Sequence, residues 1–331
     1  MSEKKYFAAA NTVNGFVSYY DEIFGKCSKI YIIKGGSGTG KSYFMRRCAE
    51  YVKGLDAFED IEYFYCSFDP SSLDGILING DVAVIDGTAP HVYEPKMPGA
   101  KENIVDLGRF WDADKLRESR DTFSDLFEKK KNCFKRAYGY LSACGELDKV
   151  REGIISEYID DEKLRAAAAK LVSDIECDEC EGSKLRIVSA LGRDGRVLFD
   201  TYEGLSERTI KVANKDGAAH WFLENVILEA RRFGKAIYIS YDPLFINRPN
   251  AVMIGNTAIM TADCESSKWL ETESDKISKL KAVQNELVDE AIKEFRRAAE
   301  VHFSIEKIYA SAMDFGRKEE FTEDFLKKFI I

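Results

Sequence analysis

The sequence has few of the features that mark membrane, secreted or nucleic-acid-binding proteins. It contains no run of about 18 apolar residues, the length that a membrane-spanning helix needs. The N-terminal MSEKKYFAAA offers too short an apolar stretch for a signal peptide. Positive charge is not in excess, because the net charge is −9, so there is no bulk attraction to nucleic acid or anionic lipid. We therefore expect a cytoplasmic protein with neither a membrane nor a nucleic acid as partner.

Cysteine is present, but not in the arrangement of a disulfide framework. The eight cysteines are scattered along the chain, and without a secretory signal we expect them to be reduced. Cys177 and Cys180 form one C-x-x-C pair, with no second pair or histidine nearby to complete a zinc site. A structural or incidental role is our preferred interpretation, and a metal or redox role is the alternative.

Length and composition indicate an ordinary globular protein of more than one domain. The 331 residues exceed a typical domain, and the content of 45% hydrophobic and 32% charged residues allows a sizeable core. The stretches 30–33, 61–67 and 82–85 read as buried strands, with a helical pattern after the first. This alternation predicts an α/β fold, with a parallel sheet flanked by helices.

Residues 35–42 carry the clearest chemical motif. Gly35, Gly40, Lys41 and Ser42 satisfy G-x-x-x-x-G-K-[ST], the P-loop pattern, between a predicted strand and a predicted helix. Glycines let successive backbone N–H groups face a phosphate, and the helix N-terminus adds its positive dipole end. Lys41 is expected to reach the β- and γ-phosphates of ATP, and the Ser42 hydroxyl is expected to bind Mg²⁺. The predicted nucleotide-binding residues are Gly35, Gly36, Ser37, Gly38, Thr39, Gly40, Lys41, Ser42 and Tyr43.

A P-loop enzyme also needs an acidic group near Mg²⁺, at the end of a neighbouring strand. Asp86 follows the apolar stretch 82–85, so we predict Lys41 and Asp86 as catalytic residues, with Ser42 and Asp86 as metal ligands. An Asp-Gly turn is the alternative for Asp86. The residue after it is Gly87, so the pattern leaves the hydrolytic base unassigned.

Two further segments offer candidate contacts. The loop 87–99 holds three of the six prolines and follows a strand, where ligands bind in α/β sheets. Its polar side chains either contact substrate or merely help the loop to cap the sheet: Thr88, His91, Glu94 and Lys96. Asp69 also follows a strand and is a candidate for orienting water or an acceptor, although an Asp-Pro turn explains it as well.

The remaining segments give expectations about local structure. Residues 7–20 are expected to form a hairpin around an Asn-Gly turn, and residues 73–77 a short helix or turn. Residues 115–175 have almost no glycine and no proline, which predicts long helices, with an αα-hairpin breaking at 142–145. The basic residues 129–131 and 135–136 lie either on a solvated helix face or on a lid over the phosphates.

The chain also contains an internal repeat. Residues 7–45 match residues 187–223 at a nearly constant spacing, and the Asp-Pro pair at 69–70 returns at 242–243. We interpret the chain as a tandem duplication in which each copy carries a helical-hairpin appendage. The predicted domains are 1–180, with a helical insertion at about 101–176, and 181–331.

The second copy has lost the motif. Ala219 and His220 stand in place of Lys41 and Ser42, and Thr261 stands in place of Asp86. We expect His220 to have a packing or capping role rather than that of a ligand, and the second copy to bind no nucleotide in the usual way.

The motif together with the segments CSFDPSSLDGI, VIDGTAPHVYEP and the repeated start FAAANTVNGF resembles an uncharacterised family of bacterial tandem-repeat P-loop ATPases, found among Gram-positive anaerobes and spore-formers. The resemblance covers most of the chain. It implies a cytoplasmic ATP-binding protein with two P-loop-type domains. Members often keep both motifs, so the second copy of this chain departs from the family.

Three functions fit these observations. The first is a Mg²⁺-dependent P-loop NTPase, hydrolysing ATP or switching with it, in which the second copy lends an arginine such as Arg231, Arg232 or Arg248. The second is a kinase for a nucleotide or small molecule, with phosphates gripped by Arg117, Arg120 or Arg136. The third is a non-catalytic, nucleotide-gated interaction protein. The acceptor or protein partner stays unassigned.

Overall fold

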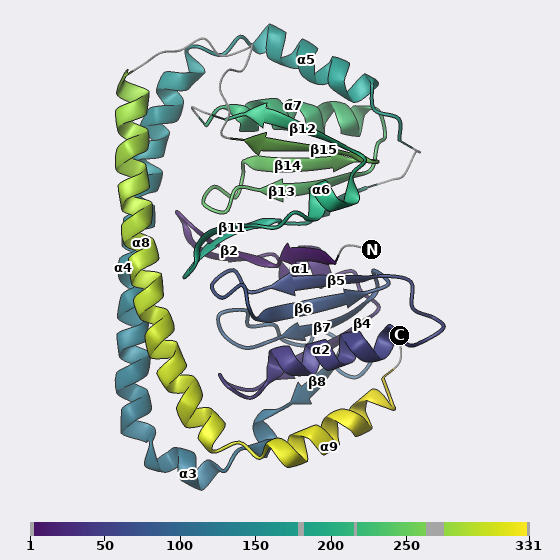
Figure 1. Ribbon diagram of the computed structural model, residues 1–331, viewed down its shortest axis with the longest axis vertical. Coiled ribbons are helices and arrows are strands. Elements are labelled where there is room, and N and C mark those ends of the chain that lie inside the picture. Colours follow the sequence, from purple (N-terminus) through teal and green to yellow (C-terminus); the bar gives the residue numbers. More distant parts are fainter. Residues whose placement is uncertain (1–2, 178–181, 215–216, 263–274, 330–331) are drawn as a thin grey trace.

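The structure is a computed structural model that describes residues 3–177, 182–214, 217–262 and 275–329. Two β-sheets lie one above the other, and two long helices run past both of them along one side of the molecule (Figure 1). Within the described residues, no helix has the length and apolar character needed to cross a membrane.

The first sheet is mixed rather than parallel. Its order is β1 (Lys4–Phe7), β5 (Ile61–Tyr65), β6 (Leu73–Ile78), β7 (Val82–Asp86), β4 (Lys29–Lys34) and β8 (Glu102–Asp106). The pairs β1–β5, β7–β4 and β4–β8 are parallel, whereas β6 runs antiparallel to both of its neighbours. The expectation of a helix or turn at 73–77 is therefore wrong. Every residue of β6 is buried between two strands, and this pairing overrides the local preference of its Asp-Gly pair for a turn.

The second sheet repeats five strands of the first. Its order is β9 (Ser183–Leu185), β13 (Ile237–Tyr241), β14 (Pro249–Ile254), β15 (Thr257–Ala262) and β12 (Arg208–Ala213). The directions match those of β1, β5, β6, β7 and β4 pair by pair. Each sheet is accompanied by a two-stranded hairpin: β2 (Ala9–Thr12) with β3 (Gly15–Ser18), and β10 (Ser189–Gly192) with β11 (Gly195–Leu198). The hairpin expected at 7–20 is confirmed.

Helices accompany each sheet. The shorter ones are α1 (Tyr20–Phe24), α2 (Lys41–Val52), the 3₁₀ helix η1 (Gly108–Phe110), α3 (Ala113–Glu118), α6 (Thr201–Leu205) and α7 (Ala219–Arg232). The apolar residues of α2 at Phe44, Met45, Cys48 and Val52 are buried, as their helical spacing predicts. Helix α7 contacts the second sheet through β13, β14 and β15.

Two helices of 37 residues each pack side by side along the molecule: α4 (Arg120–Ser156) and α8 (Asp275–Ser311). The predicted break at 142–145 is wrong, because α4 continues through it. Gly145 lies against the β2–β3 hairpin, where a Cβ atom would stand 2.9 Å from the Cβ of Val13. The glycine allows this close approach and does not end the helix.

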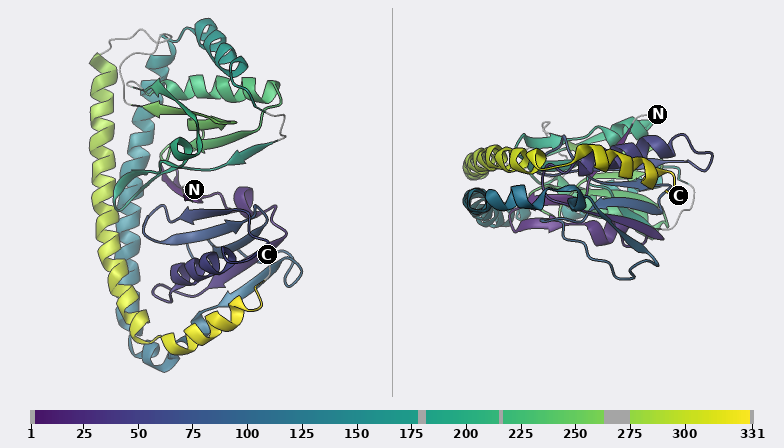
Figure 2. Two further views of the ribbon diagram at one scale, coloured as in Figure 1. Left: turned by 45° about the vertical axis from the view of Figure 1, so that its right-hand side comes forward. Right: turned by 90° about the horizontal axis from the view of Figure 1, so that it is seen from below.

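The helices that follow α4 and α8 cross to opposite sheets (Figures 1 and 2). Helix α5 (Asp161–Ser173) follows the first sheet in sequence, yet its Leu164 and Val172 are buried in one cluster with α7 of the second sheet. Helix α9 (Phe315–Leu326) follows the second sheet, yet Phe325 contacts Phe44 of α2 in the first. Each half therefore covers part of the other, and the predicted boundary at 180 separates segments that pack together.

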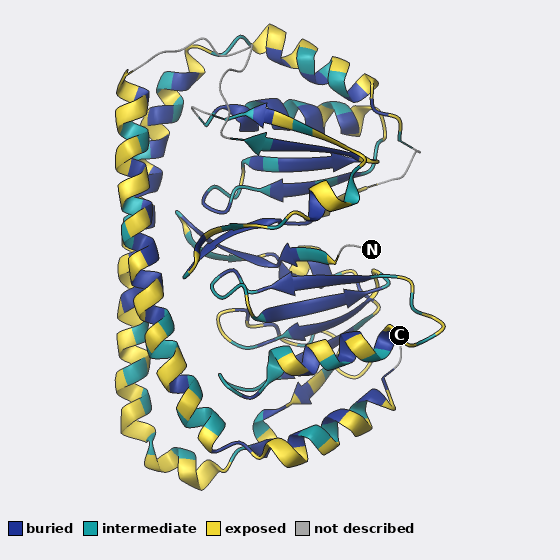
Figure 3. Ribbon diagram, viewed as in Figure 1, coloured by how far each residue is buried: buried dark blue, intermediate teal, exposed yellow. Residues whose placement is uncertain are grey.

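The core is continuous between the two sheets. Phe7 donates its backbone N–H to the carbonyl of Ile187 at 2.8 Å, and both residues belong to the main hydrophobic cluster. The buried guanidinium of Arg186 pairs with Glu62 across the same interface at 2.7 Å. Figure 3 shows buried strands in both sheets, with exposed residues along the outer faces of the long helices.

Candidate functional site

The glycine-rich loop connects β4 to α2. Gly38 and Gly40 have φ values of 73° and 81°, a left-handed conformation that side chains other than glycine rarely adopt. Gly40 is the N-cap of α2, so the loop delivers Lys41 to the first position of the helix. The expected strand, turn and helix are thus all present.

Lys41 and Asp86 lie together at the carboxyl edge of the sheet. The Lys41 Nζ atom is 3.5 Å from the Asp86 carboxylate and donates to the carbonyls of Gly35 and Gly36 at 3.1 and 2.9 Å. The two charged residues meet because β4 pairs in parallel with β7, with Ile33 opposite Asp86. Burial raises the pKa of the Asp86 carboxyl, and the Lys41 ammonium opposes that shift.

The two predicted metal ligands also make hydrogen bonds within the protein. Ser42 Oγ accepts a hydrogen bond from the backbone N–H of Leu73 at 3.0 Å. Asp86 Oδ1 accepts from the backbone N–H and hydroxyl of Thr88 at 2.9 and 2.6 Å. The expected Asp turn therefore exists, but it uses Oδ1, whereas Oδ2 faces Lys41. A hydroxyl and a carboxylate are oxygen donors of the kind that Mg²⁺ prefers.

Asp69 also forms its expected turn, but with an additional partner. Its carboxylate accepts from the backbone N–H and hydroxyl of Ser71 at 3.1 and 2.6 Å. The guanidinium of Arg193, at the tip of the β10–β11 hairpin, pairs with the same carboxylate at 2.7 Å. The second half thus brings an arginine to the site. Sequence reasoning missed Arg193, although the spacing of 180 residues in the sequence match aligns this charged residue with the apolar Val13.

The last turns of α8 pack on the glycine loop. A Cβ atom on Gly38 would stand 2.8 Å from the backbone carbonyl of Glu306. A Cβ atom on Gly36 would stand 3.2 Å from Trp111 and 3.4 Å from Tyr309, whose rings stack with centroids 5.1 Å apart. Helix α8, which packs on the loop, is far from it in sequence. The local pattern of residues 35–42 therefore could not predict this contact.

The two long helices bring titratable groups within electrostatic range of Lys41. Lys130 Nζ lies 2.9 Å from His302 Nδ1. Burial, followed by the charges of Lys130 and Lys41, lowers the pKa of His302 to about 4, so this imidazole is neutral at pH 7. Burial, followed by the Asp69 charge, raises the pKa of the Glu306 carboxyl. Of the basic run 129–131, Lys130 is thus directed to the site rather than to solvent.

Of the four polar candidates in the loop 87–99, Thr88 bonds to Asp86 as described, and His91 Nε2 lies 3.0 Å from Asp74 Oδ2 in the buried interior. Burial lowers the pKa of His91, but the Asp74 carboxylate outweighs this effect and the net shift is upward. The other two candidates form ion pairs at the surface, Glu94 with Lys34 and Lys96 with Asp21.

One group of described residues has the composition of a metal site. Ligand atoms of Cys66, Asp74 and His91 lie within 4.8 Å of one another. The sequence pattern did not single out this group, because its members come from three separate segments. Of the C-x-x-C pair, Cys177 is described and half-buried, and Cys180 lies outside the described residues.

In the second half, the described residues between β12 and α7 are held by contacts with side chains. The Asn214 side-chain oxygen accepts the backbone N–H of Ala219, at the start of α7, at 3.1 Å. His220 lies 3.0 Å from the carbonyl of Gly217 and 3.1 Å from Glu152. His220 is buried against Trp221, so the packing alternative expected for it is confirmed; its Nδ1 atom contacts the carbonyl of Gly217 and not an N–H group of α7.

Most of the arginines predicted as candidate phosphate ligands form ion pairs with carboxylates of the protein. Arg248 pairs with Asp148 and Glu152 of α4, and Arg231 and Arg232 belong to the last turn of α7. Arg117 pairs with Asp114, and Arg136 pairs with Glu294.

Comparison of the chain with protein-family models, with curated proteins and with solved structures finds no match.

Proposed function

We propose that the chain is a Mg²⁺-dependent, ATP-binding P-loop NTPase of the cytoplasm, with one nucleotide site in its first half. The observation that carries this proposal is the placement of Lys41 and Asp86. They lie 3.5 Å apart at the ends of two adjacent parallel strands, directly after a loop with two left-handed glycines. A lysine at a helix N-terminus beside an acidic strand end is the arrangement that P-loop enzymes use for phosphates and Mg²⁺.

The likeness of the two halves supports the proposed duplication. Five strands recur in the same order and the same directions, each set is accompanied by a hairpin, and each is followed by a helix of 37 residues. The second half has Asn214 bound to the start of α7, where the first half has its glycine loop. This difference supports a single nucleotide site in the molecule.

Each residue of the first site has a role in the proposed function. Backbone N–H groups of residues 35–42 bind the phosphates, and Lys41 exchanges the carbonyls of Gly35 and Gly36 for phosphate oxygens. Ser42 and Asp86 would hold Mg²⁺, which neutralises charge on the phosphates. Arg193 and Lys130 supply further positive charge from the second half and from α4.

The contact between α8 and the loop favours ATP hydrolysis or switching over transfer to an acceptor. Glu306 and Tyr309 pack directly on the glycines that would hold the phosphates. Nucleotide in the loop would therefore press on a helix that spans both halves. Transfer of the γ-phosphate to a nucleotide or small molecule is the second candidate, because Lys130 of α4 lies within electrostatic range of Lys41.

Replacement of Lys41 tests the proposal. Lys41→Ala is expected to weaken ATP binding by about tenfold to a hundredfold, because two charge-assisted contacts to phosphate are lost. Lys53→Ala, at the exposed other end of α2, is the matched control and should leave ATP binding unchanged. Isothermal titration with Mg-ATP measures both affinities. Equal affinities for the wild-type protein and Lys41→Ala would disprove the proposal.

Phosphate release and acceptor dependence then separate the reaction types. Release by the protein alone indicates hydrolysis, and turnover that requires an added acceptor indicates a kinase. Tight binding without turnover, alone or with acceptors, indicates a nucleotide-gated switch.

A further inference from the structure

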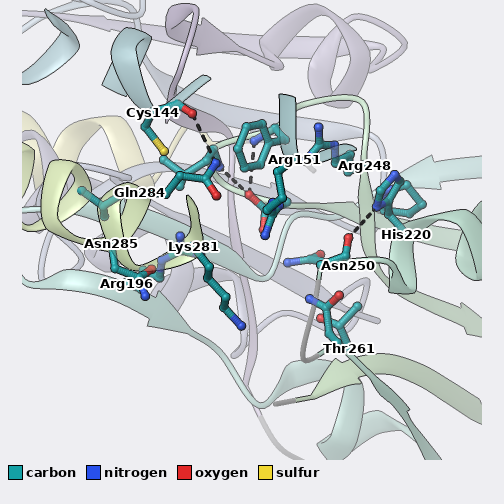
Figure 4. A pocket seen from close by; sticks show the side chains of 17 residues that line it. Cys144, Arg151, Arg196, His220, Arg248, Asn250, Thr261, Lys281, Gln284 and Asn285 are labelled. Atoms are coloured by element: carbon teal, nitrogen blue, oxygen red, sulfur yellow. Dashed lines mark hydrogen bonds between the residues drawn. The ribbon is translucent and has the colours of Figure 1, made fainter. Parts of the chain in front are cut away.

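The second half contains a cavity of about 350 Å³. It lies between the carboxyl ends of β12 and β15 and the two long helices (Figure 4). Asn214 and Gly217 contribute the loop at the end of β12, Thr261 contributes the end of β15, and Lys281 and Gln284 contribute one face of α8. The cavity thus occupies the place in the second sheet that the glycine loop and Asp86 occupy in the first. In α/β sheets this is the edge at which ligands bind.

The lining of the cavity is strongly basic. Four of its side chains are cationic, Arg151, Arg196, Arg248 and Lys281, and one is acidic, Asp242. Asp148 and Glu152 neutralise part of this charge from behind, through contacts with Arg151 and Arg248. The backbone of Arg196 pairs with Leu191 in the β10–β11 hairpin, but its guanidinium has no hydrogen bond or ion pair with the described residues. The balance of charge therefore favours an anion in the cavity.

Two buried polar atoms of the lining lack hydrogen-bond partners. Arg151 is 7% exposed, and its Nε atom has no partner among the described residues. The same holds for Asn250 Oδ1, although the amide nitrogen of that residue donates to Ser189. Leaving such buried groups unpaired destabilises the folded protein, so a ligand that accepts a hydrogen bond from Arg151 would recover part of that cost. This observation indicates a ligand independently of the charge count.

We infer that the cavity binds a small phosphorylated molecule. Arginine guanidinium groups match phosphate oxygens in geometry as well as charge, and three arginines line this cavity. Its volume lies at the lower end of the range of small-molecule sites, about 300–1,000 Å³, which suits a nucleoside monophosphate or a sugar phosphate. The start of α7 is bound by Asn214, so the phosphate would be held by side chains and not by a glycine loop. The second half then carries a binding site of its own, lined by side chains that take no part in the proposed nucleotide site.

Titration of the Lys41→Ala protein tests this inference, because that change weakens the proposed first site and leaves the lining of the cavity intact. The probes are inorganic pyrophosphate and adenosine monophosphate, added separately to the full chain. We expect one binding event per chain, weakened about tenfold by Arg196→Ala, which removes one charge-assisted contact. Arg232→Ala removes the same charge from the exposed end of α7 and is the matched control, with unchanged affinity.

Each outcome decides the question. Binding that falls with Arg196→Ala but not with Arg232→Ala supports the site. Absence of binding for both probes at millimolar concentration overturns the inference. Binding that Arg196→Ala leaves unchanged, or that both variants weaken equally, overturns it as well. The result does not depend on the proposed function, since loss of ATP binding by Lys41→Ala is measured separately.

Discussion

Gly38 lies where the loop passes beneath α8. Its φ of 73° and the Glu306 carbonyl, 2.8 Å from the position of a Cβ atom, both exclude a larger side chain. We expect Gly38→Ala to lower the free energy of unfolding by about 1–3 kcal/mol, because it adds backbone strain and a contact with main-chain atoms that cannot turn aside. It should also weaken ATP binding. Urea denaturation and titration with Mg-ATP measure the two effects.

Gly139 provides the matched control. It is an exposed glycine within α4, and no heavy atom lies within 4 Å of the position of its Cβ atom. Gly139→Ala should therefore raise the free energy of unfolding by about 0.5–1 kcal/mol through helix propensity. Equal stability of Gly38→Ala and the wild-type protein would show that α8 does not rest on the loop in solution.

At the scale of elements, local pattern predicted some segments well and others poorly. The strand, turn and helix at residues 30–52 could be predicted because each signal lies within the segment itself. Strand β6 could not be predicted, because its Asp74 and Gly75 make contacts with residues that are distant in the sequence. Asp74 contacts His91, and a Cβ atom on Gly75 would stand 3.0 Å from Phe24. Residues that usually mark a turn are used here for a buried contact and for close packing.

The same limit applies to the site. Lys41 and Asp86 could be predicted, since each follows a strand with a recognisable apolar run. Arg193 and Lys130 could not, because their positions depend on how the second half and the long helices pack against the first. Side chains that come from distant elements carry no local signal.

Asp148 connects three elements and has a pH-dependent effect on stability. It is 1% exposed and accepts from Arg151 at 2.6 Å and from Gln284 at 3.0 Å, and it pairs with Arg248. Burial raises the pKa of its carboxyl, but the guanidinium groups outweigh burial and the net shift is downward. Asp148→Asn leaves two buried guanidinium groups with less negative charge, which should cost about 3–5 kcal/mol at pH 7.

The sign of the pKa shift sets the pH window for this test. A carboxyl whose folded pKa is depressed stabilises the protein above its unfolded pKa of about 3.9, and this stabilisation is lost as the pH falls through the folded value. The stability difference between Asp148→Asn and the wild-type protein should thus hold from pH 7 to pH 5 and shrink at pH 3. Asp125→Asn, on the exposed face of α4, is the control. A difference of equal size at pH 7 and pH 3 would contradict this account.

At the scale of the whole molecule, the exchange of helices makes each half depend on the other. Helix α9 lies on α2, where Arg47 pairs with Glu319 and Glu323. Helix α5 packs in one hydrophobic cluster with α7 and the strands of the second sheet. The proposed nucleotide site combines residues of both halves. Because each half covers part of the other, we expect the chain not to divide at residue 180 into two independent domains.

Expression of the two predicted domains as separate chains tests this dependence. Chain 1–180 lacks α8 and α9, so Phe44 and the glycine loop lose their cover, and the buried face of α5 loses the second sheet. We expect chain 1–180 alone to aggregate or to unfold without cooperativity, because this apolar surface becomes exposed. Coexpression with chain 181–331 should give a 1:1 complex that binds ATP, detected by copurification, size-exclusion chromatography and titration. A full chain cut at an inserted protease site after residue 180 should stay assembled, as the control. If chain 1–180 alone is monomeric, unfolds cooperatively and binds ATP as tightly as the full chain, then the crossing helices contribute nothing to the site and each copy is an independent domain.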